Sequence, residues 1–317
     1  MSDVAVLELP YPLRLSPHRA AAEARHLRWL DEFDMLGSAL TRAEYARWDV
    51  AGLAALSYPD CTPEELTLAT DLMGFYFLFD DQFDGPLGQR PGEVAAICEE
   101  LTEVLHGRRP ATTLSPCTRA FEDLWHRISL GMSDRWRARA TYHWEWYFAS
   151  HPAEAAGRRG GLPPDREGYL ILRRGTAAME SVLDMVERLG RFEVAPAAFH
   201  SPHLRQLRQL AADIPSLTND VRSYPQEAPR GDVNNLVMIV QRERGCTLAE
   251  AGSAVLAEAQ SMVDRYTRLV DELPRTYREL ELGPQQSRTA ERYADGLTAW
   301  LTGYLSWESR TGRYQEE

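Results

Sequence analysis

The chain has 317 residues, and its 35 basic residues are all arginines, because the sequence contains no lysine. The missing lysine excludes Schiff-base and pyridoxal-phosphate enzymes, P-loop nucleotide hydrolases and protein kinases, which all need a lysine for their chemistry. With 47 acidic residues the net charge is −12, which argues against nucleic acid as a partner, since phosphate backbones select basic surfaces. Any anion that binds must be held by arginine, polar groups or a metal.

The four cysteines, Cys61, Cys98, Cys117 and Cys246, are far apart and contain no Cys-x-x-Cys pair. This pattern favours free thiols in a reducing compartment. The start of the chain lacks the basic patch and apolar run of a signal peptide. No run of about 18 apolar residues is present to span a membrane. We therefore expect a cytoplasmic protein.

Apolar residues recur at helical spacing throughout the chain, while the alternating pattern of β-strands is almost missing. The expected helices are, in chain order, residues 18–35, 39–54, 64–79, 92–106, 117–130, 133–150, 166–190, 202–224, 232–244, 247–273 and 286–309. Glycine and proline residues separate these helices, but no break is long enough to divide two folding units. The sequence predicts an all-α fold in which residues 1–317 form a single domain.

The first group of acidic residues follows the apolar segment Phe75–Phe79. Asp80 and Asp84 lie one turn apart on the same helix face, and Asp81 points elsewhere. Two carboxylates at the C-terminal end of a helix repel each other and oppose the helix dipole, so a divalent cation such as Mg²⁺ would stabilise them. The alternative is an acidic helix end that leads into the turn at Asp84-Gly85.

A second group of oxygen donors lies at Asn219, Ser223 and Glu227. Steps of four residues place all three on one face of a helix. An amide, a hydroxyl and a carboxylate form a ligand set suited to Mg²⁺ or Mn²⁺, although a solvated polar stripe would have the same pattern. Pro225 cannot donate a backbone hydrogen bond, so we expect the helix to kink or end there.

Together the two groups resemble the motifs of the class I terpene synthases, in particular the bacterial terpene cyclases. The DDxxD motif of this family is matched by Asp80–Asp84, and its NDxxSxxxE motif by Asn219–Glu227. Arg173 matches the family's diphosphate-sensing arginine, and Arg313-Tyr314 matches its Arg-Tyr pair. The resemblance covers essentially the whole chain and is greatest with sesquiterpene cyclases. It implies an α-helical bundle with a central apolar cavity.

The resemblance further implies that three Mg²⁺ ions, or Mn²⁺ in their place, bind between the two motifs. Asp80 would hold two ions with help from Asp84, while Asn219, Ser223 and Glu227 would hold the third. The ions would neutralise a prenyl diphosphate so that its allylic C–O bond breaks.

Four side chains are expected to contact the diphosphate: Arg173, Arg174, Arg313 and Tyr314. Arginine suits this role because its forked guanidinium binds phosphate oxygens in pairs.

The chain departs from the family pattern at two positions. Gln226 stands where the family often has a lysine, so one diphosphate contact is either missing or supplied by an arginine such as Arg222 or Arg230. Ala177 stands where the family often has a glycine, four residues after the sensor. The backbone carbonyl there is expected to assist ionisation as the helix breaks, and alanine makes the break harder.

The carbocation needs a dry apolar chamber with aromatic faces. The expected wall residues are Phe75, Tyr76, Phe77, Phe79 and Trp307, and Phe77 and Trp307 match aromatic residues that line the pocket in similar cyclases. The alternative for each is packing in the core.

The reaction that the resemblance implies is cyclisation of farnesyl diphosphate to a sesquiterpene. A diterpene cyclase acting on geranylgeranyl diphosphate stays open, because the sequence does not give the pocket volume. A chain-lengthening prenyltransferase would need a second Asp-rich motif, whereas Asp80-Asp81 is the only Asp-Asp pair. A non-enzymatic helical interaction protein would bind no metal. Residues 1–15 and 309–317 are expected to close over the site. The sequence leaves open whether the protein forms a homodimer.

Overall fold

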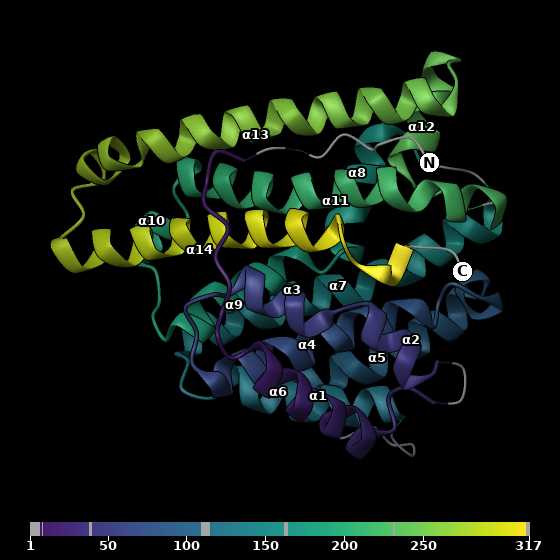
Figure 1. The fold of residues 1–317 in the computed structure, drawn as a ribbon, viewed down its shortest axis with the longest axis horizontal. Helices are drawn as coiled ribbons and strands as arrows, with labels where there is room; N and C mark the ends of the chain where they lie inside the picture. Colours follow the sequence, from purple (N-terminus) through teal and green to yellow (C-terminus); the bar gives the residue numbers. More distant parts are fainter. Residues whose placement is uncertain are drawn as a thin grey trace.

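Helices form the regular structure of this protein (Figure 1). The computed structural model describes residue 7 and residues 9–37, 40–108, 115–161, 164–230 and 232–314, without the side chains of residues 229 and 230. The α-helices are α1 (Arg19–Phe33), α2 (Arg42–Arg47), α3 (Val50–Ser57), α4 (Pro63–Asp81), α5 (Pro91–Leu105), α6 (Pro116–Ser129), α7 (Asp134–Gly160), α8 (Arg166–Thr176), α9 (Met179–Gly190), α10 (Pro196–Phe199), α11 (Pro202–Arg230), α12 (Leu236–Arg244), α13 (Leu248–Glu279) and α14 (Pro284–Glu308). Short 3-10 helices, η1 (Pro86–Gln89) and η2 (Gly312–Tyr314), follow α4 and α14. The predicted all-α fold is confirmed.

Two of the expected helices are each divided by a short break. The helix expected over 39–54 is divided at Trp48 and Asp49, and the helix expected over 166–190 is divided at Ala177 and Ala178. Asp49 and Ala178 have left-handed φ angles of 51° and 56°. Apolar periodicity continues across such breaks, so the sequence pattern does not reveal them.

Three helices are longer than expected, because an internal proline ends none of them. α7 runs through Pro152 to Gly160, α11 runs through Pro225 to Arg230, and α13 runs through Pro274 to Glu279. Of the kink or end expected at Pro225, the end is therefore wrong. A proline removes one backbone hydrogen bond, and tertiary packing over a long helix can offset that loss.

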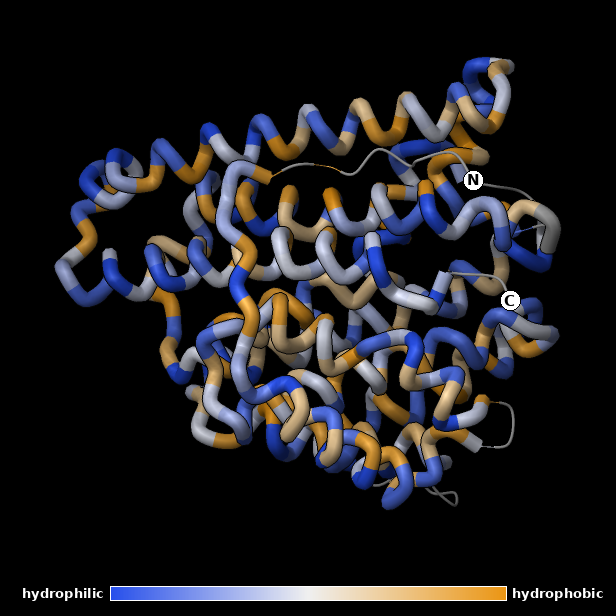
Figure 2. The backbone as a smooth tube through the Cα atoms, viewed as in Figure 1, coloured by the Kyte–Doolittle hydropathy of each residue, from blue (hydrophilic) through white to orange (hydrophobic). Residues whose placement is uncertain are grey.

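The helices form layers around α4 and the C-terminal helix α14. α4 packs against α1, α3, α6 and α9, while α14 lies between α3 and α11, and α13 covers the outer side of α11 (Figure 1). Figure 2 shows hydrophilic positions on the outer side of α13 and hydrophobic positions on the side that faces α11. No helix within the described ranges is both long and apolar enough to cross a membrane.

α14 approaches α3 very closely at Gly303. A Cβ atom built at Gly303 would lie 2.5 Å from the carbonyl carbon of Leu56 and 2.6 Å from the amide nitrogen of Ser57. Backbone atoms inside a packed helix cannot move aside as a flexible side chain can. The contact between these two helices, which both contribute to the cavity described below, therefore requires glycine at this position.

We predict that Gly303→Ala lowers the free energy of unfolding by about 1–3 kcal/mol through overpacking, measured by urea denaturation. Gly92→Ala is the matched control, because no atom lies within 4 Å of the position of its Cβ. This control should be neutral or slightly stabilising, since alanine favours helix. Equal stability of the two variants would contradict the close approach of α14 to α3.

Candidate active site

A cavity of about 390 Å³ opens between α4, α7, α11, α14 and the break between α8 and α9. Along α4 and α11, the lining residues change from apolar to polar toward the C-terminal end of each helix. The predicted site residues that line this cavity are Asp80, Asp84, Asn219, Ser223, Glu227, Arg173, Arg313, Tyr314, Tyr76, Phe77 and Ala177. The fold thus brings together residues that are far apart in the sequence.

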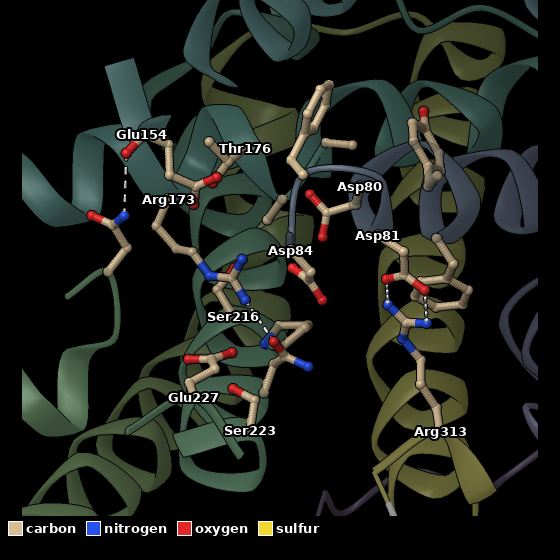
Figure 3. Close-up of a pocket in the computed structure, with 18 of the residues that line it drawn as sticks. Asp80, Asp81, Asp84, Glu154, Arg173, Thr176, Ser216, Ser223, Glu227 and Arg313 are labelled. Atoms are coloured by element: carbon tan, nitrogen blue, oxygen red, sulfur yellow. Dashed lines mark hydrogen bonds and ion pairs between the residues drawn. The ribbon is translucent and has the colours of Figure 1, made fainter. Parts of the chain in front are cut away.

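Asp80 and Asp84 form the first polar wall and point into the cavity (Figure 3). Asp80 lies in the last turn of α4. Asp84 lies in the turn that follows, where its amide donates to the Asp81 carbonyl at 3.2 Å. The Asp80 side chain is 47% exposed, and this exposed surface lines the cavity. Desolvation there raises the pKa of Asp80 well above its usual range, and the charges of Glu154, Asp84 and Asp81 raise it further.

Asn219, Ser223 and Glu227 form the second polar wall on one face of α11. The side-chain amide of Asn235 donates to the Glu227 carboxylate at 2.9 Å and lies 3.5 Å from the Ser223 hydroxyl. Burial raises the pKa of Glu227 to about 7, and the charge of Asp220 adds to this effect. The second wall is therefore held in place by neighbouring hydrogen bonds before any ligand binds.

Arg173 lies over the second wall from α8. Its Nη2 donates to Oδ1 of Asn219 at 2.6 Å, and its Nε lies 3.2 Å from Oδ1 of Asp220. Asp220 is fixed in turn by the Tyr169 hydroxyl and by the Leu236 amide at 2.9 Å. Asp220, for which the sequence analysis predicted no role, thus orients Arg173.

Arg313 binds the third carboxylate of the first motif. Its Nη1 donates to Oδ2 of Asp81 at 2.9 Å, and its second terminal nitrogen donates to the other oxygen (Figure 3). The guanidinium carbon lies 4.4 Å from the ring centroid of Trp48 and 4.5 Å from that of Phe77. In this conformation Arg313 is therefore engaged by a carboxylate and two aromatic rings.

The segment that carries Arg313 is attached to the break between α2 and α3. The Trp48 carbonyl accepts hydrogen bonds from the indole of Trp307 and the hydroxyl of Thr311, both at 2.8 Å. Tyr314 is joined to the second wall, because Nδ2 of Asn219 donates to its hydroxyl at 2.7 Å. The described part of residues 309–317 thus borders the cavity.

The N-terminal segment takes a different course. Tyr11 packs edge-on against Tyr266 of α13 at 6.5 Å, and Arg14 forms an ion pair with Asp60 at 2.6 Å. No described residue between 7 and 15 lines the cavity. Residues 1–6 and 8 of the segment expected to close over the site lie outside the described residues.

α7 supplies three cavity residues that the sequence did not identify: Tyr147, Glu154 and Arg158. Nε of Arg158 donates to Asp232 at 3.0 Å, and its Nη2 lies 3.3 Å from the Glu154 carboxylate. Burial raises the pKa of Glu154, although Arg158 lowers it. Tyr147, Glu154 and Arg158 are spaced by seven and four residues, which places them on one face of α7. The sequence analysis did not identify Glu154 and Arg158 because it expected this helix to end at residue 150.

His151 of α7 lies behind Asp80 of α4. Its Nδ1 is 4.0 Å from Oδ1 of Asp80, its side chain is 1% exposed, and neither ring nitrogen has a hydrogen-bond partner among the described residues. Burial lowers the pKa of His151 to about 3, so the imidazole is neutral at physiological pH. It therefore adds no positive charge beside the aspartates.

Three of the expected wall residues do not line the cavity. Phe75 and Phe79 stack on each other at 5.5 Å and are fully buried in the core, because the helical period turns them away from Tyr76 and Phe77. Trp307 lies behind Phe77, with the two rings stacked at 5.5 Å. These three residues support the wall and do not form it.

Two arginines that were expected to contact the diphosphate also lie outside the cavity lining. Arg174 does not line the cavity and instead donates to both oxygens of Asp213, at 2.8 and 2.9 Å. Nε of Arg222 lies 3.4 Å from Glu308, also outside the lining, while the side chain of Arg230 lies outside the described residues. Gln226 does face the cavity, and the additional arginine that lines it is Arg158.

The apolar part of the wall contains residues that periodicity alone could not single out. These are Trp48, Leu53, Met73, Met179, Val182, Trp300 and Tyr304. Each has the pattern of an ordinary core residue, and only the position of neighbouring helices decides which buried residues face a cavity.

The chain from residue 71 to 265 matches the family model described as terpene synthase family 2, C-terminal metal binding. The crystal structure of germacradien-4-ol synthase from Streptomyces citricolor has 58% sequence identity and a TM-score of 0.91, covering 98% of this chain and 100% of that one. Pentalenene synthase from Streptomyces exfoliatus is 35% identical over 98% of this chain and 92% of its own length. The (−)-β-caryophyllene synthase of Saccharothrix espanaensis is 35% identical over 98% of this chain and 88% of its own length.

The protein therefore belongs to the bacterial class I terpene synthases of terpene synthase family 2, as its two motifs predicted. Members of this class are lyases that act on prenyl diphosphates. Among its homologues are the pentalenene synthases and other sesquiterpene synthases.

The ion pair between Arg313 and Asp81 can be measured with a double-mutant cycle. We predict that Arg313→Gln, Asp81→Asn and the double variant show a coupling energy of about 1–2 kcal/mol in urea denaturation, because a forked, partly buried pair is stronger than an exposed one. The exposed pair Arg275–Glu279 is the control and should give below about 0.5 kcal/mol. Equal coupling in the two pairs would show that Asp81 does not hold Arg313 in solution.

Proposed function

We propose that this enzyme catalyses the Mg²⁺-dependent ionisation and cyclisation of farnesyl diphosphate to a cyclic sesquiterpene, with release of diphosphate. The observation that carries the proposal is the division of one cavity into two parts. One part has two facing sets of oxygen ligands with Arg158, Arg173 and Arg313, and the other has apolar and aromatic walls. The first suits a metal-bound diphosphate and the second a hydrocarbon chain. One relative, 35% identical, is named as cyclising (2E,6E)-farnesyl diphosphate.

The residues present fit Mg²⁺. The donors of both walls are carboxylate, amide and hydroxyl oxygens, which are the hard ligands that this ion prefers. Burial raises the pKa of Asp80 and Glu227, so a bound cation would offset a real electrostatic cost. In the described ranges no three His, Cys, Asp or Glu side chains form a metal cluster by themselves. Diphosphate oxygens are therefore proposed to complete the coordination.

In this proposal, Asp80 and Asp84 hold ions from the first wall, and Asn219, Ser223 and Glu227 hold one from the second. Three ions are expected. When bound, Mg²⁺ neutralises the charge that develops on the leaving diphosphate.

Both cavity arginines of the expected diphosphate site must change partners to bind substrate. Arg173 now donates to the Asn219 oxygen that is proposed as a metal ligand, so it has to turn this N–H toward a diphosphate oxygen. Arg313 likewise has to give up part of its contact with Asp81. Tyr314 stays beside Asn219 as a further donor. Substrate binding is thus proposed to replace internal ion pairs with contacts to the diphosphate.

The apolar part of the cavity excludes water and presents aromatic rings. Tyr76, Phe77, Trp48 and Trp300 line it, and each ring face stabilises a desolvated cation by roughly 0.5–2 kcal/mol. We further propose that the carbonyl of Ala177, at the break after α8, assists ionisation. The rings of Phe77 and Trp48 border the polar part of the cavity, since both contact the Arg313 guanidinium.

The substrate is tested by incubating the protein with geranyl, farnesyl or geranylgeranyl diphosphate and Mg²⁺, followed by mass analysis of the volatile products. We expect a cyclic C15 product from farnesyl diphosphate and no turnover after removal of divalent cations with EDTA. A C20 product as the main outcome would replace the proposed substrate. Absence of turnover with all three, together with no thermal stabilisation by Mg²⁺ plus inorganic diphosphate, would reject the enzyme function.

The metal ligands are tested by Asp80→Ala and Asn219→Ala. We predict that each variant lowers kcat at least 100-fold while its melting temperature stays within a few degrees of the wild type, because both side chains face the cavity and not the core. Asp134→Ala is the control, since its side chain is 96% exposed. Near-wild-type turnover in either cavity variant would refute the assignment of that wall.

A further inference from the structure

The break between α8 and α9 contains a residue in an unfavourable backbone conformation. Ala178 has φ 56° and ψ 14°, in the left-handed region, although it is not glycine. A side chain in this region costs of order 1 kcal/mol or more and persists only where the surroundings hold it. Thr176, Ala177 and Ala178 all line the cavity. The strain therefore lies in the active-site wall, directly after the helix that carries Arg173.

A chain of hydrogen bonds ends on the strained residue. The hydroxyl of Ser181 donates to the Ala178 carbonyl at 2.8 Å, and the Tyr76 hydroxyl lies 2.7 Å from the Ser181 oxygen. Because Ser181 uses its single hydrogen on Ala178, Tyr76 must be the donor to Ser181. The Val182 amide also donates to the Ala178 carbonyl, at 3.0 Å. The first turn of α9 is thus tied to the strained carbonyl and to α4.

A second tyrosine holds the next residue of the same turn. The hydroxyl of Tyr58, which directly follows α3, donates to the Val182 carbonyl at 3.0 Å. Tyr58 and Tyr76 are only 6% and 7% exposed, and their rings are packed against Trp300 and Trp144. Burial raises the pKa of both phenols, so both hydroxyls stay protonated and donate.

We propose that Tyr58 and Tyr76, named here the tyrosine clamp, are positioning residues that hold the break at Ala177–Ala178 in its strained form through Ser181 and Val182. The clamp reaches from α3 and α4 to α9. It therefore fixes the carbonyls at the break relative to the wall that carries Asp80. Its catalytic consequence rests on the proposed function, because positioning matters only if a substrate ionises at this wall.

The effect on catalysis follows from the geometry. The amide of Ala177 donates to the Arg173 carbonyl at 2.9 Å, so the break and the arginine form one continuous backbone segment. If the clamp is lost, Ala178 can relax toward an ordinary conformation and displace the groups before it. A displacement of this kind lowers the rate of the chemical step more than it weakens substrate binding.

The first test measures hydrogen exchange of the free protein and needs no substrate. We expect Tyr76→Phe and Tyr58→Phe to increase amide exchange in residues 178–183 by about fivefold to tenfold, because each removes a buried hydrogen bond. Tyr266→Phe is the matched control, since its hydroxyl lies 2.9 Å from that of Thr298 and it does not line the cavity. The control should leave exchange at 178–183 unchanged.

The second test measures steady-state kinetics with farnesyl diphosphate. Tyr76→Phe and Tyr58→Phe are expected to lower kcat about fivefold to tenfold with KM changed less than twofold. Tyr58 does not line the cavity, so its effect cannot come from a lost substrate contact. In an Ala178→Gly variant, kcat should no longer depend on the hydroxyls of Tyr58 and Tyr76, because glycine adopts the left-handed conformation without strain. In that background Tyr76→Phe should lower kcat less than twofold.

The outcomes separate the two proposals. Unchanged exchange at 178–183 in both tyrosine variants, or a loss of kcat that Ala178→Gly does not reduce, would overturn the clamp. A wild-type protein that turns over no prenyl diphosphate would overturn the proposed function, and the exchange test would still decide whether the clamp exists.

Discussion

The structure depends on one electrostatic constraint, the gathering of carboxylates around a cavity in which burial partly desolvates them. Asp80, Glu154 and Glu227 all have raised pKa values because of burial. Charges interact far more strongly in such surroundings than in bulk water. Arg158 and Arg173 offset part of the negative charge, and each does so while paired to a carboxylate. The balance suits an anion that arrives together with cations, since an anion alone would be repelled by the carboxylates of both walls.

This balance explains why the walls come from distant parts of the chain. A single helix cannot carry enough convergent carboxylates without repulsion between neighbouring turns. The fold instead divides them among α4, α7 and α11, and it brings arginines from α7, α8 and the segment after α14 between them. The aromatic core behind α4, with Phe75 and Phe79 at its centre, provides the rigid support on which the first wall rests. In α4, core packing is thus provided by Phe75 and Phe79, while the charge of the first wall lies at the C-terminal end of the helix.

Residue type and spacing within single helices predicted the fold class and the members of both polar walls, while Arg173 came from the resemblance to the family. Metal binding by these walls stays a prediction. The sequence did not predict Glu154 or the strained Ala178. Glu154 lies beyond Pro152, where a local rule ends a helix that tertiary packing extends. Ala178 accepts hydrogen bonds from Ser181 and Val182 of α9, and these two residues are contacted in turn by Tyr76 of α4 and by Tyr58 after α3, which are distant in sequence and belong to no local pattern. Similarly, periodicity identified Phe75 and Phe77 as buried, but only the neighbouring helices determine which of them meets the cavity.

The attachment of the last described segment to the α2–α3 break has a consequence for how the protein folds. Trp307 donates to the carbonyl of Trp48 across 259 residues of sequence, and Arg313 reaches Asp81 across 232. Contacts of such long range are entropically costly and form late in folding. During synthesis, every helix is made before the arginine that neutralises Asp81. The aspartates at the end of α4 must therefore remain soluble without this partner until the final segment docks.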